Sequence, residues 1–206
     1  MRIAVVGGTG DFGLALARRL AEAGEEVVIG SRDAARAQEK AAEAGAAEGA
    51  ANEDAVRGAD LVVLAVKADA ALPTAESLAD AIGATPTLSV ASELRFAKQG
   101  VFPGEDARSI AERTQELLRG PVVAGLHSLA AASLGHGPAA GDALVCGDDE
   151  EAKRLALELA SGVVTGRALD AGPLGSARAL EGLTAVIVNL NKRYRGHAGV
   201  SVTGLP

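Results

Sequence analysis

The sequence predicts an α/β fold: a doubly wound, mostly parallel sheet followed by a small C-terminal α/β subdomain. Three observations predict it. A glycine-rich turn follows the first apolar run, and short β-branched runs then alternate with helical stretches along most of the 206 residues. From Asp148 an acidic run leads into a charged amphipathic stretch. Since parallel strands need crossover connections, usually helices, this order indicates a Rossmann-type domain.

The first strand, turn and helix carry the strongest signal. Residues 2–6 are apolar and β-branched, the three glycines of a Gly-x-Gly-x-x-Gly pattern follow, and helical spacing begins at Leu14. In a dinucleotide site the first glycine permits the tight turn, the second lets the backbone approach a pyrophosphate, and the third lets helix and strand pack closely. The helix N-terminus then receives the phosphate charge. The contacts expected here are Gly8, Thr9, Gly10, Asp11, Phe12 and Gly13.

The end of the second strand, residues 26–30, indicates which dinucleotide is bound. An NAD site usually has an acidic residue here, whereas this chain has Ser31 and Arg32, with Arg36 one helical turn further on. Such a cluster favours the 2′-phosphate of NADP. Asp33 is better placed as the N-cap of the helix expected over residues 33–45. The alternative is that both arginines are ordinary solvated helix charges.

The following elements alternate in the same way. Val66 ends the clearest central strand, and the carboxyl end of that strand should face the cofactor crevice. The expected order is a short helix from 52 to about 58, a strand over 60–66, a helix over 70–82, a strand over 87–90, an irregular stretch over 91–104, a helix over 105–118, a strand over 121–126, and a strand over 142–147 that ends the main sheet.

The segment after residue 148 predicts a second, smaller unit. We expect a charged helix to Ser161, a strand over 163–169 and a long final helix over 180–193 or beyond. Residues 1–148 would then form the NADP-binding domain, and residues 149–206 a small helical subdomain that closes the site. The apolar stripe of the last helix indicates a core contact or a dimer seam rather than a cofactor contact, and it comprises Leu183, Ile187, Val188 and Leu190.

Composition limits the class of partner. A net charge of −7 argues against a nucleic-acid surface, which needs a clustered basic face, so small-molecule substrates fit better. No apolar run approaches the ~20 residues that span a bilayer, so no membrane partner is expected. The single cysteine, Cys146, excludes an internal disulfide and indicates a reducing cytoplasm. Residues 2–6 are needed as the first strand, so no removable signal peptide is expected.

Few residues offer acid–base or nucleophilic chemistry. The chain has no nucleophile elbow, its three histidines lack metal-ligand spacing, and Cys146 has no adjacent base, so we expect no metal site. Hydride transfer between two bound carriers would suit such a site, because it depends mainly on the alignment of two rings. His127, just past a strand end, is the candidate catalytic residue; a structural histidine is the alternative. His136 is expected to be exposed in a loop.

Several short motifs, in this order and spacing, resemble the NADPH-dependent coenzyme F420 reductase family over nearly the whole chain. They are Gly7-Gly8-Thr9-Gly10, Gly30-Ser31-Arg32, Lys98-Gln99-Gly100, Leu126-His127-Ser128, Gly147-Asp148-Asp149, Asp170-Ala171-Gly172-Pro173-Leu174 and, near the C-terminus, Glu181-x-Leu183-Thr184 with Asn189, Arg193-Tyr194 and His197-Ala198-Gly199.

The resemblance implies an oxidoreductase that exchanges a hydride between NADP(H) and the deazaflavin coenzyme F420, and a homodimer. It implies Thr9, Gly10, Ser31, Arg32 and Arg36 as NADP contacts. The implied deazaflavin pocket comprises His127, Ser128, Leu129, Ala131 and Ala198. The position of His127 past a strand end predicts that it hydrogen-bonds the deazaflavin ring rather than removing a proton.

Two places depart from the family pattern. Lys67-Ala68 stands where relatives usually have Pro-Trp, and Ala91-Ser92 where many have Asn-Pro; both border the crevice. Two alternatives to the F420 reductase therefore stay open. One is an NADP-dependent reductase of another small substrate on the same fold, such as an imine or a metal chelate, and the other is a non-catalytic NADP-sensing domain.

Overall fold

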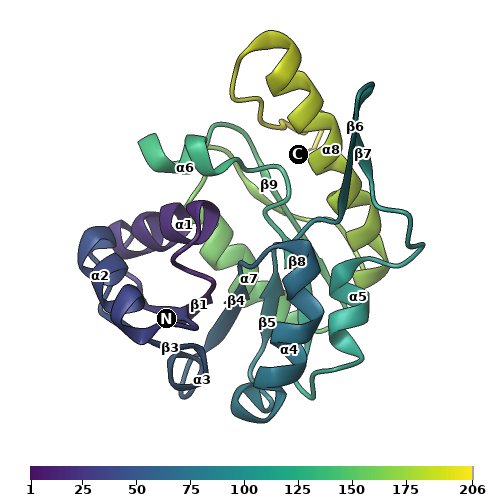
Figure 1. Cartoon of the computed structure of the whole chain (residues 1–206). Coiled ribbons are helices and arrows are strands. Elements are labelled where there is room, and N and C mark those ends of the chain that lie inside the picture. The colour runs from purple at the N-terminus through teal and green to yellow at the C-terminus, as the bar shows by residue number, and fades with distance from the viewer. Residues whose placement is uncertain (206) are drawn as a thin grey trace.

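The structure, a computed structural model, describes residues 1–205 and has one eight-stranded sheet at its centre (Figure 1). The strand order is β10-β9-β8-β5-β4-β1-β2-β3, and every neighbouring pair is parallel except β8 and β9. The predicted doubly wound, mostly parallel sheet is thus confirmed. The strands are β1 (Arg2–Val6), β2 (Glu26–Ser31), β3 (Glu48–Ala51), β4 (Leu61–Leu64), β5 (Thr87–Ser89), β8 (Val122–Gly125), β9 (Ala143–Gly147) and β10 (Ala168–Asp170).

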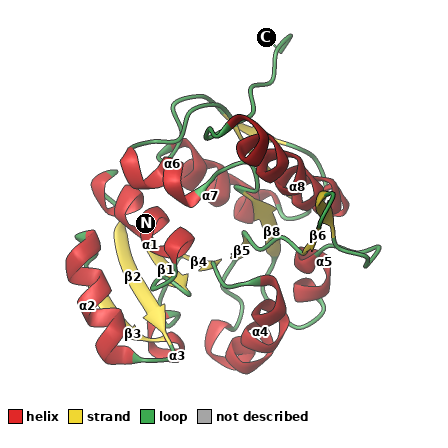
Figure 2. Cartoon of the chain, turned by 45° about the horizontal axis from the view of Figure 1, so that its top comes forward, coloured by secondary structure: helices red, strands yellow, loops and turns green. Residues whose placement is uncertain are grey.

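Helices cover both faces of this sheet (Figure 2). Alternate residues of β1 belong to two separate apolar clusters: Ile3 and Val5 lie in one, Ala4 and Val6 in the other. Because successive side chains of a strand point to opposite faces, each face needs its own layer. The first cluster includes α1 (Asp11–Glu22), α2 (Ala34–Ala44), α6 (Ala131–His136) and α7 (Glu150–Ser161); the second includes α4 (Ala68–Ile82), α5 (Ile110–Gln115) and α8 (Ala177–Tyr194), with the short α3 (Asn52–Ala55) beside it.

Three regions of the chain differ from the sequence-based expectations. β3 lies between the helix expected over 33–45 and the short helix expected from 52, where the sequence analysis assigned no element, and an antiparallel hairpin of β6 (Leu94–Ala97) and β7 (Gly100–Pro103) replaces the irregular stretch expected over 91–104. α6 replaces the loop expected around His136, which is exposed as predicted. β3 forms despite poor strand propensity because it completes the edge beside β2.

The C-terminal third also differs in its boundaries. The helix expected over 105–118 is reduced to α5, whose start is fixed by a capping box at Ser109. The strand expected over 163–169 is reduced to β10, which pairs in parallel with β9. The expectation that residues 142–147 end the main sheet is therefore wrong, because β10 adds one more strand.

The last segment lies partly in the sheet and partly across its end. β10 extends the sheet and α7 packs against β9, so sheet hydrogen bonds cross the domain boundary predicted at residue 148. The 3₁₀ turn η1 (Leu174–Ser176) leads into α8, which lies beside the β6–β7 hairpin (Figure 1). Of the helices in residues 1–205, none is long and apolar enough to cross a membrane.

Candidate functional site

The glycine-rich turn between β1 and α1 is held by the end of β2. The backbone N–H groups of Gly7 and Gly8 both donate to the Gly30 carbonyl at 3.2 Å. The positive φ of the turn, +81°, falls on Gly7, whereas the sequence pattern assigned the tight turn to Gly8. At Gly8 a Cβ would instead lie 2.9 Å from the Ile29 side chain, so this glycine is needed for packing.

The third glycine of the pattern has its expected role. A Cβ on Gly13 would lie 2.5 Å from the Gly7 carbonyl oxygen, so only glycine lets α1 approach the turn this closely. Gly10, the N-cap of α1, is different: it is exposed, and a Cβ there would meet the Gly7 oxygen at a tolerable 3.4 Å. Because no side chain within residues 1–205 caps α1, its first-turn N–H groups can donate hydrogen bonds to an outside anion.

Two exposed arginines, Arg32 and Arg36, follow the end of β2. Asp33 caps α2 by accepting the Arg36 N–H at 3.2 Å, and the buried Ser31 hydroxyl accepts the Asp33 N–H at 3.2 Å. The predicted capping role of Asp33 is thus confirmed. The Arg32 and Arg36 side chains are exposed, and within residues 1–205 neither forms an ion pair. Both cations are therefore available to a phosphate.

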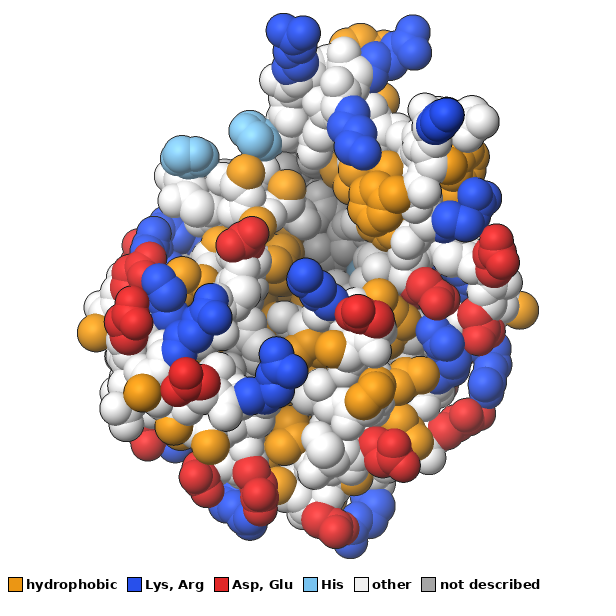
Figure 3. Space-filling view, viewed as in Figure 1, with side chains coloured by type: hydrophobic (Ala, Val, Ile, Leu, Met, Phe, Trp, Pro, Cys, Tyr) orange, Lys and Arg blue, Asp and Glu red, His pale blue; other side chains and the backbone are white. Residues whose placement is uncertain are grey.

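A cleft of about 390 Å³ opens between the glycine-rich turn and α8. Figure 3 shows a hollow on this side of the molecule, with hydrophobic side chains on both sides and charged side chains along the rim below it. Lys67 is the only Lys, Arg, Asp or Glu among the lining residues that the structure describes. The lining is Phe12, Ala65, Val66, Lys67, Ala68, Val90, Ala91, Ser92, Leu94, Phe96, Leu126, His127, Leu129 and Thr184.

His127 lies in this cleft wall at the centre of a small hydrogen-bond network. Its Nδ1 is 3.1 Å from the Ser92 hydroxyl, and that hydroxyl is 2.8 Å from the Thr184 hydroxyl. Thr184 in turn donates to the His127 carbonyl oxygen at 2.9 Å. The Nε2 atom is buried and has no partner among the described residues. The imidazole therefore has one edge fixed by hydrogen bonds and one buried edge whose nitrogen is unpaired within the described residues.

The backbone before His127 is in an unfavourable conformation. Leu126, directly after β8, has φ of +65°, and it is a buried residue with a branched side chain. A non-glycine residue in this region carries strain, and such strain is concentrated at functional sites. Here the left-handed residue turns the chain from the strand into the cleft wall and fixes the position of His127.

Burial determines the charge state of His127. The imidazole is 5% exposed, and burial lowers its pKa from 6.5 to about 4. The ring is therefore neutral at pH 7. Burial also raises the pKa of the Cys146 thiol to about 12, so this cysteine, located in β9, is an unreactive thiol.

The structure brings together only part of the predicted deazaflavin pocket. His127 and Leu129 line the cleft, as do Phe12 and Val66 from the predicted cofactor side. The Ser128 hydroxyl is directed away, donating to the Asp142 carbonyl at 3.2 Å. Two further residues are placed elsewhere: Ala131, which lines a second hollow beside α1, and Ala198, whose N–H donates to Asn191. Neither belongs to the lining of the 390 Å³ cleft.

Sequence reasoning placed Ser92 at the border of the crevice and Thr184 in a family motif, but it gave neither residue a role in the site. Ser92 follows β5 outside any regular element, and no spacing rule connects it to a residue 92 positions later. The sequence does contain one indication of the role of Thr184. It interrupts the apolar face of α8 between Leu180 and Ile187, and a hydroxyl at a core-facing position usually has a buried partner.

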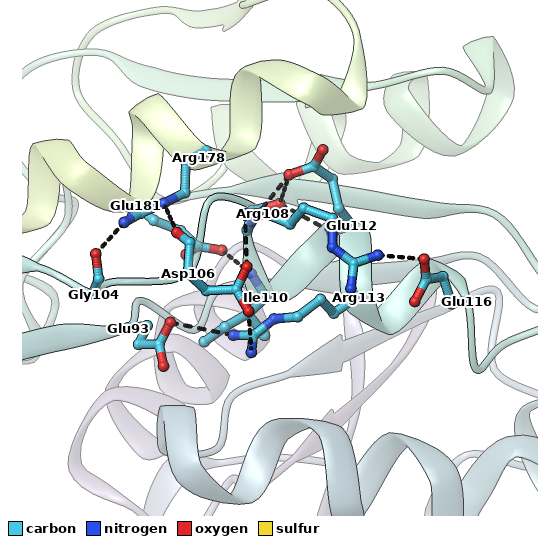
Figure 4. Close-up of polar contacts among 11 residues, drawn as sticks. Glu93, Gly104, Asp106, Arg108, Ile110, Glu112, Arg113, Glu116, Arg178 and Glu181 are labelled. Atoms are coloured by element: carbon cyan, nitrogen blue, oxygen red, sulfur yellow. Dashed lines mark hydrogen bonds and ion pairs between the residues drawn. The ribbon is translucent and has the colours of Figure 1, made fainter.

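A polar cluster fixes α8, and thereby Thr184, against the rest of the molecule (Figure 4). The buried Glu181 carboxylate accepts the Ile110 N–H at 2.6 Å and so caps α5. Arg178 donates to the carbonyls of Gly104 and Asp106. The Asn189 side chain accepts the N–H of Val101 in β7 at 2.9 Å and donates to the carbonyl of the same residue at 2.7 Å. The helix that carries Thr184 is thus anchored on both sides of that residue.

Two buried groups give opposite pH dependences of the free energy of unfolding. The unfolded chain protonates His127 near pH 6.5 and the folded one near 4, so stability falls as pH drops through this range. Burial raises the pKa of Glu181 from 4.5 to about 7. The free energy of unfolding therefore falls as pH rises from 4.5 to 7, because the unfolded chain loses this proton first. Between pH 4.5 and 6.5 the two slopes oppose each other.

We therefore expect Glu181→Gln to expose the His127 slope. Its unfolding free energy should rise with pH between 4.5 and 6.5 by up to about 1.4 kcal/mol per pH unit, while the parent protein changes much less. Urea unfolding at closely spaced pH values measures both profiles. Parallel profiles for parent and variant would show that Glu181 does not titrate in this range.

Comparison with known proteins gives consistent relatives. Residues 2–92 match the family model described as NADP oxidoreductase, coenzyme F420-dependent. The chain is 38% identical to the F420-dependent NADP reductase of Methanothermobacter thermautotrophicus, with 100% of this chain and 96% of that protein covered. It is 33% identical to the enzyme of the same name from Methanocaldococcus jannaschii, covering 100% of this chain and 99% of that protein.

Solved structures extend this likeness. A crystal structure assigned as an F420-dependent NADP reductase of Arthrobacter sp. FB24 aligns with a TM-score of 0.81 and 25% identity, covering 99% of both chains. The imine reductase of Streptomyces aurantiacus aligns with a TM-score of 0.61 at 24% identity, over 95% of this chain and 62% of that one, and shows only a shared fold. The full-length identity to the methanogen proteins shows that this chain belongs to the F420-dependent NADP reductase family.

Proposed function

We propose that this protein is an oxidoreductase that transfers a hydride between NADP(H) and the deazaflavin coenzyme F420. The observation that carries the proposal is the apolar cleft, which joins the dinucleotide turn at Phe12 and Val66 to a second wall at Phe96 and Thr184. Relatives named F420-dependent NADP reductase match the whole chain at 33–38% identity, which supports the same pair of substrates.

The residues at the dinucleotide end fit NADP. The uncapped N-terminus of α1 suits a pyrophosphate, and Gly10 leaves its backbone accessible. Arg32 and Arg36 are exposed cations without an ion pair in the described part of the chain, which suits a dianionic 2′-phosphate. NADP therefore fits the groups present better than NAD does.

The cleft residues orient and protect the reacting rings. When bound, the nicotinamide and the deazaflavin supply the hydride donor and acceptor themselves, so the protein needs no strong acid or base. Apolar walls from Phe12, Val66 and Leu129 exclude water, and neutral His127 has one buried ring nitrogen without a partner in the described part of the chain. Holding two flat rings in contact converts a bimolecular step into one within a single complex.

A test of the function uses purified protein, NADPH and a panel of acceptors. We expect oxidation of NADPH when F420 is added and none with imines or ferric chelates. Turnover with an imine alone would favour the second reductase class, whose fold the imine reductases share. Binding of NADPH without turnover of any acceptor would indicate a sensor.

His127→Ala tests the second wall of the cleft. We expect kcat/KM for F420 to fall by about two- to tenfold, because one buried hydrogen bond contributes roughly 0.5–1.5 kcal/mol, while the Michaelis constant for NADPH changes little. Steady-state kinetics with each substrate varied in turn give both values. A loss confined to NADPH would assign His127 to the nicotinamide instead. Normal turnover with a lower melting temperature would give it a structural role only.

We further propose that the protein acts in the cytoplasm as a homodimer. The lone Cys146 is a free thiol, which suits a reducing compartment. Val186, Leu190 and Tyr194 recur every four residues on α8 and are exposed, which supports a partner surface on that helix. Light scattering with fractionation of cells checks both statements.

A further inference from the structure

The three hydrogen bonds around His127 restrict where their protons can be. Ser92 and Thr184 each have one hydroxyl proton, and the His127 carbonyl can only accept. Thr184 is 2.9 Å from that carbonyl oxygen and donates its single proton to it. In the contact with Ser92, at 2.8 Å, Thr184 must then accept.

The remaining proton follows by the same count. Ser92 uses its hydroxyl proton on Thr184, so its contact with His127 Nδ1, at 3.1 Å, requires the proton to come from the imidazole. In the opposite assignment Ser92 donates to Nδ1 and Thr184 to Ser92, and the carbonyl loses its bond. A buried carbonyl without a partner costs about 1–3 kcal/mol, so the first assignment is favoured.

We infer that Ser92 and Thr184 hold His127 as the Nδ1–H tautomer, so that its unpartnered Nε2 accepts a hydrogen bond from an amide-type N–H of a ring bound in the cleft. Ser92 and Thr184 are positioning residues in this arrangement, and His127 contacts the ligand. The neutral charge state makes the assignment possible, because a protonated imidazole would donate from both nitrogens.

The ligand chemistry follows from the lone pair. A buried nitrogen acceptor binds a donor and excludes a carbonyl or carboxylate at the same position. An amide-type N–H occurs on the pyrimidine ring of a deazaflavin and on the carboxamide of nicotinamide. The identity of the ligand rests on the proposed function, whereas the tautomer rests on the hydrogen bonds of the chain alone.

The tautomer can be measured directly by ¹⁵N NMR of histidine-labelled protein. The chain has three histidines, so His127→Ala identifies the resonances of interest by their loss. At pH 7 without ligand we expect one protonated nitrogen at Nδ1 and one unprotonated nitrogen at Nε2. An Nε2–H tautomer, or rapid exchange between both, would overturn the inference.

Substitutions in the network test its cause. Thr184→Val frees the Ser92 proton for Nδ1, so the tautomer should shift toward Nε2–H, and kcat/KM should fall by about tenfold. Thr184→Ser keeps the hydroxyl, so this variant should keep the Nδ1–H tautomer and the parent kcat/KM. Thr114→Val is the matched control, because Thr114 is a buried threonine in α5 whose hydroxyl has no partner in residues 1–205. An unchanged tautomer in Thr184→Val would refute the proton count.

Ligand titrations identify the donor. Oxidised NADP and its 3-acetylpyridine analogue, which lacks the carboxamide N–H, form one arm, and a deazaflavin with its N3-methyl derivative forms the other. We expect the Nε2 resonance to move with one unmodified ligand and to stay in place with its blocked analogue. No movement with either would overturn the acceptor role. Failure of NADPH to reduce F420, with the apo tautomer as expected, would refute the proposed function only.

Discussion

Replacing Arg32 and Arg36 together by alanine should raise the Michaelis constant for NADPH by about two powers of ten. Each charge-assisted bond to a phosphate contributes roughly 1.5–3 kcal/mol, and about 1.4 kcal/mol corresponds to a tenfold change. Both arginines are exposed and without an ion pair within the described residues, so their removal leaves no carboxylate unpaired. The stability of the fold should therefore change little.

The specificity of this effect is its main test. NADH lacks the 2′-phosphate, so its Michaelis constant should stay nearly constant in the double variant. Arg57→Ala is the control, since Arg57 is an exposed arginine in the turn after α3 that pairs with Glu53. Equal losses with NADPH and NADH would remove the 2′-phosphate assignment. The effect should also shrink at high salt, because exposed charges are screened.

Gly13→Ala should disrupt the dinucleotide end and the fold together. The added Cβ would lie 2.5 Å from the Gly7 carbonyl oxygen and 2.9 Å from the Gly8 Cα, both of them backbone atoms that cannot rotate away. Moving α1 away from the turn should lower the free energy of unfolding by about 1–3 kcal/mol. NADPH binding should weaken by about tenfold or more, because the N-terminus of α1 moves with it.

Gly182→Ala is the control for this substitution. Gly182 is also helical, but a Cβ there would meet Pro103 at an ordinary 3.5 Å. Since glycine inside a helix costs roughly 0.5–1 kcal/mol relative to alanine, this variant should be more stable than the parent. Urea unfolding and NADPH titration of both variants provide the comparison. Equal stability of the two would show that the contact at Gly13 is not required.

The sequence alone predicted the glycine-rich turn, the cap of α2 and the doubly wound sheet. Gly13 and the capping Asp33 act through neighbours a few residues away, so local rules found them. The alternation of buried strands and helices predicted the doubly wound sheet for the same reason. β3 was missed because its stability comes from pairing with β2 and not from its own residues.

Only the tertiary structure decided how the second wall of the cleft is built. Thr184 and Ser92 lie 92 positions apart, and α8 brings them together only because the chain returns across the end of the sheet. Contacts with other segments also place Ser128 and Ala198 outside the cleft lining, since the Ser128 hydroxyl donates to the Asp142 carbonyl and the Ala198 N–H to Asn191. Sequence periodicity reports which face of an element is buried, but contacts between distant elements depend on how the faces pack, which no local pattern encodes.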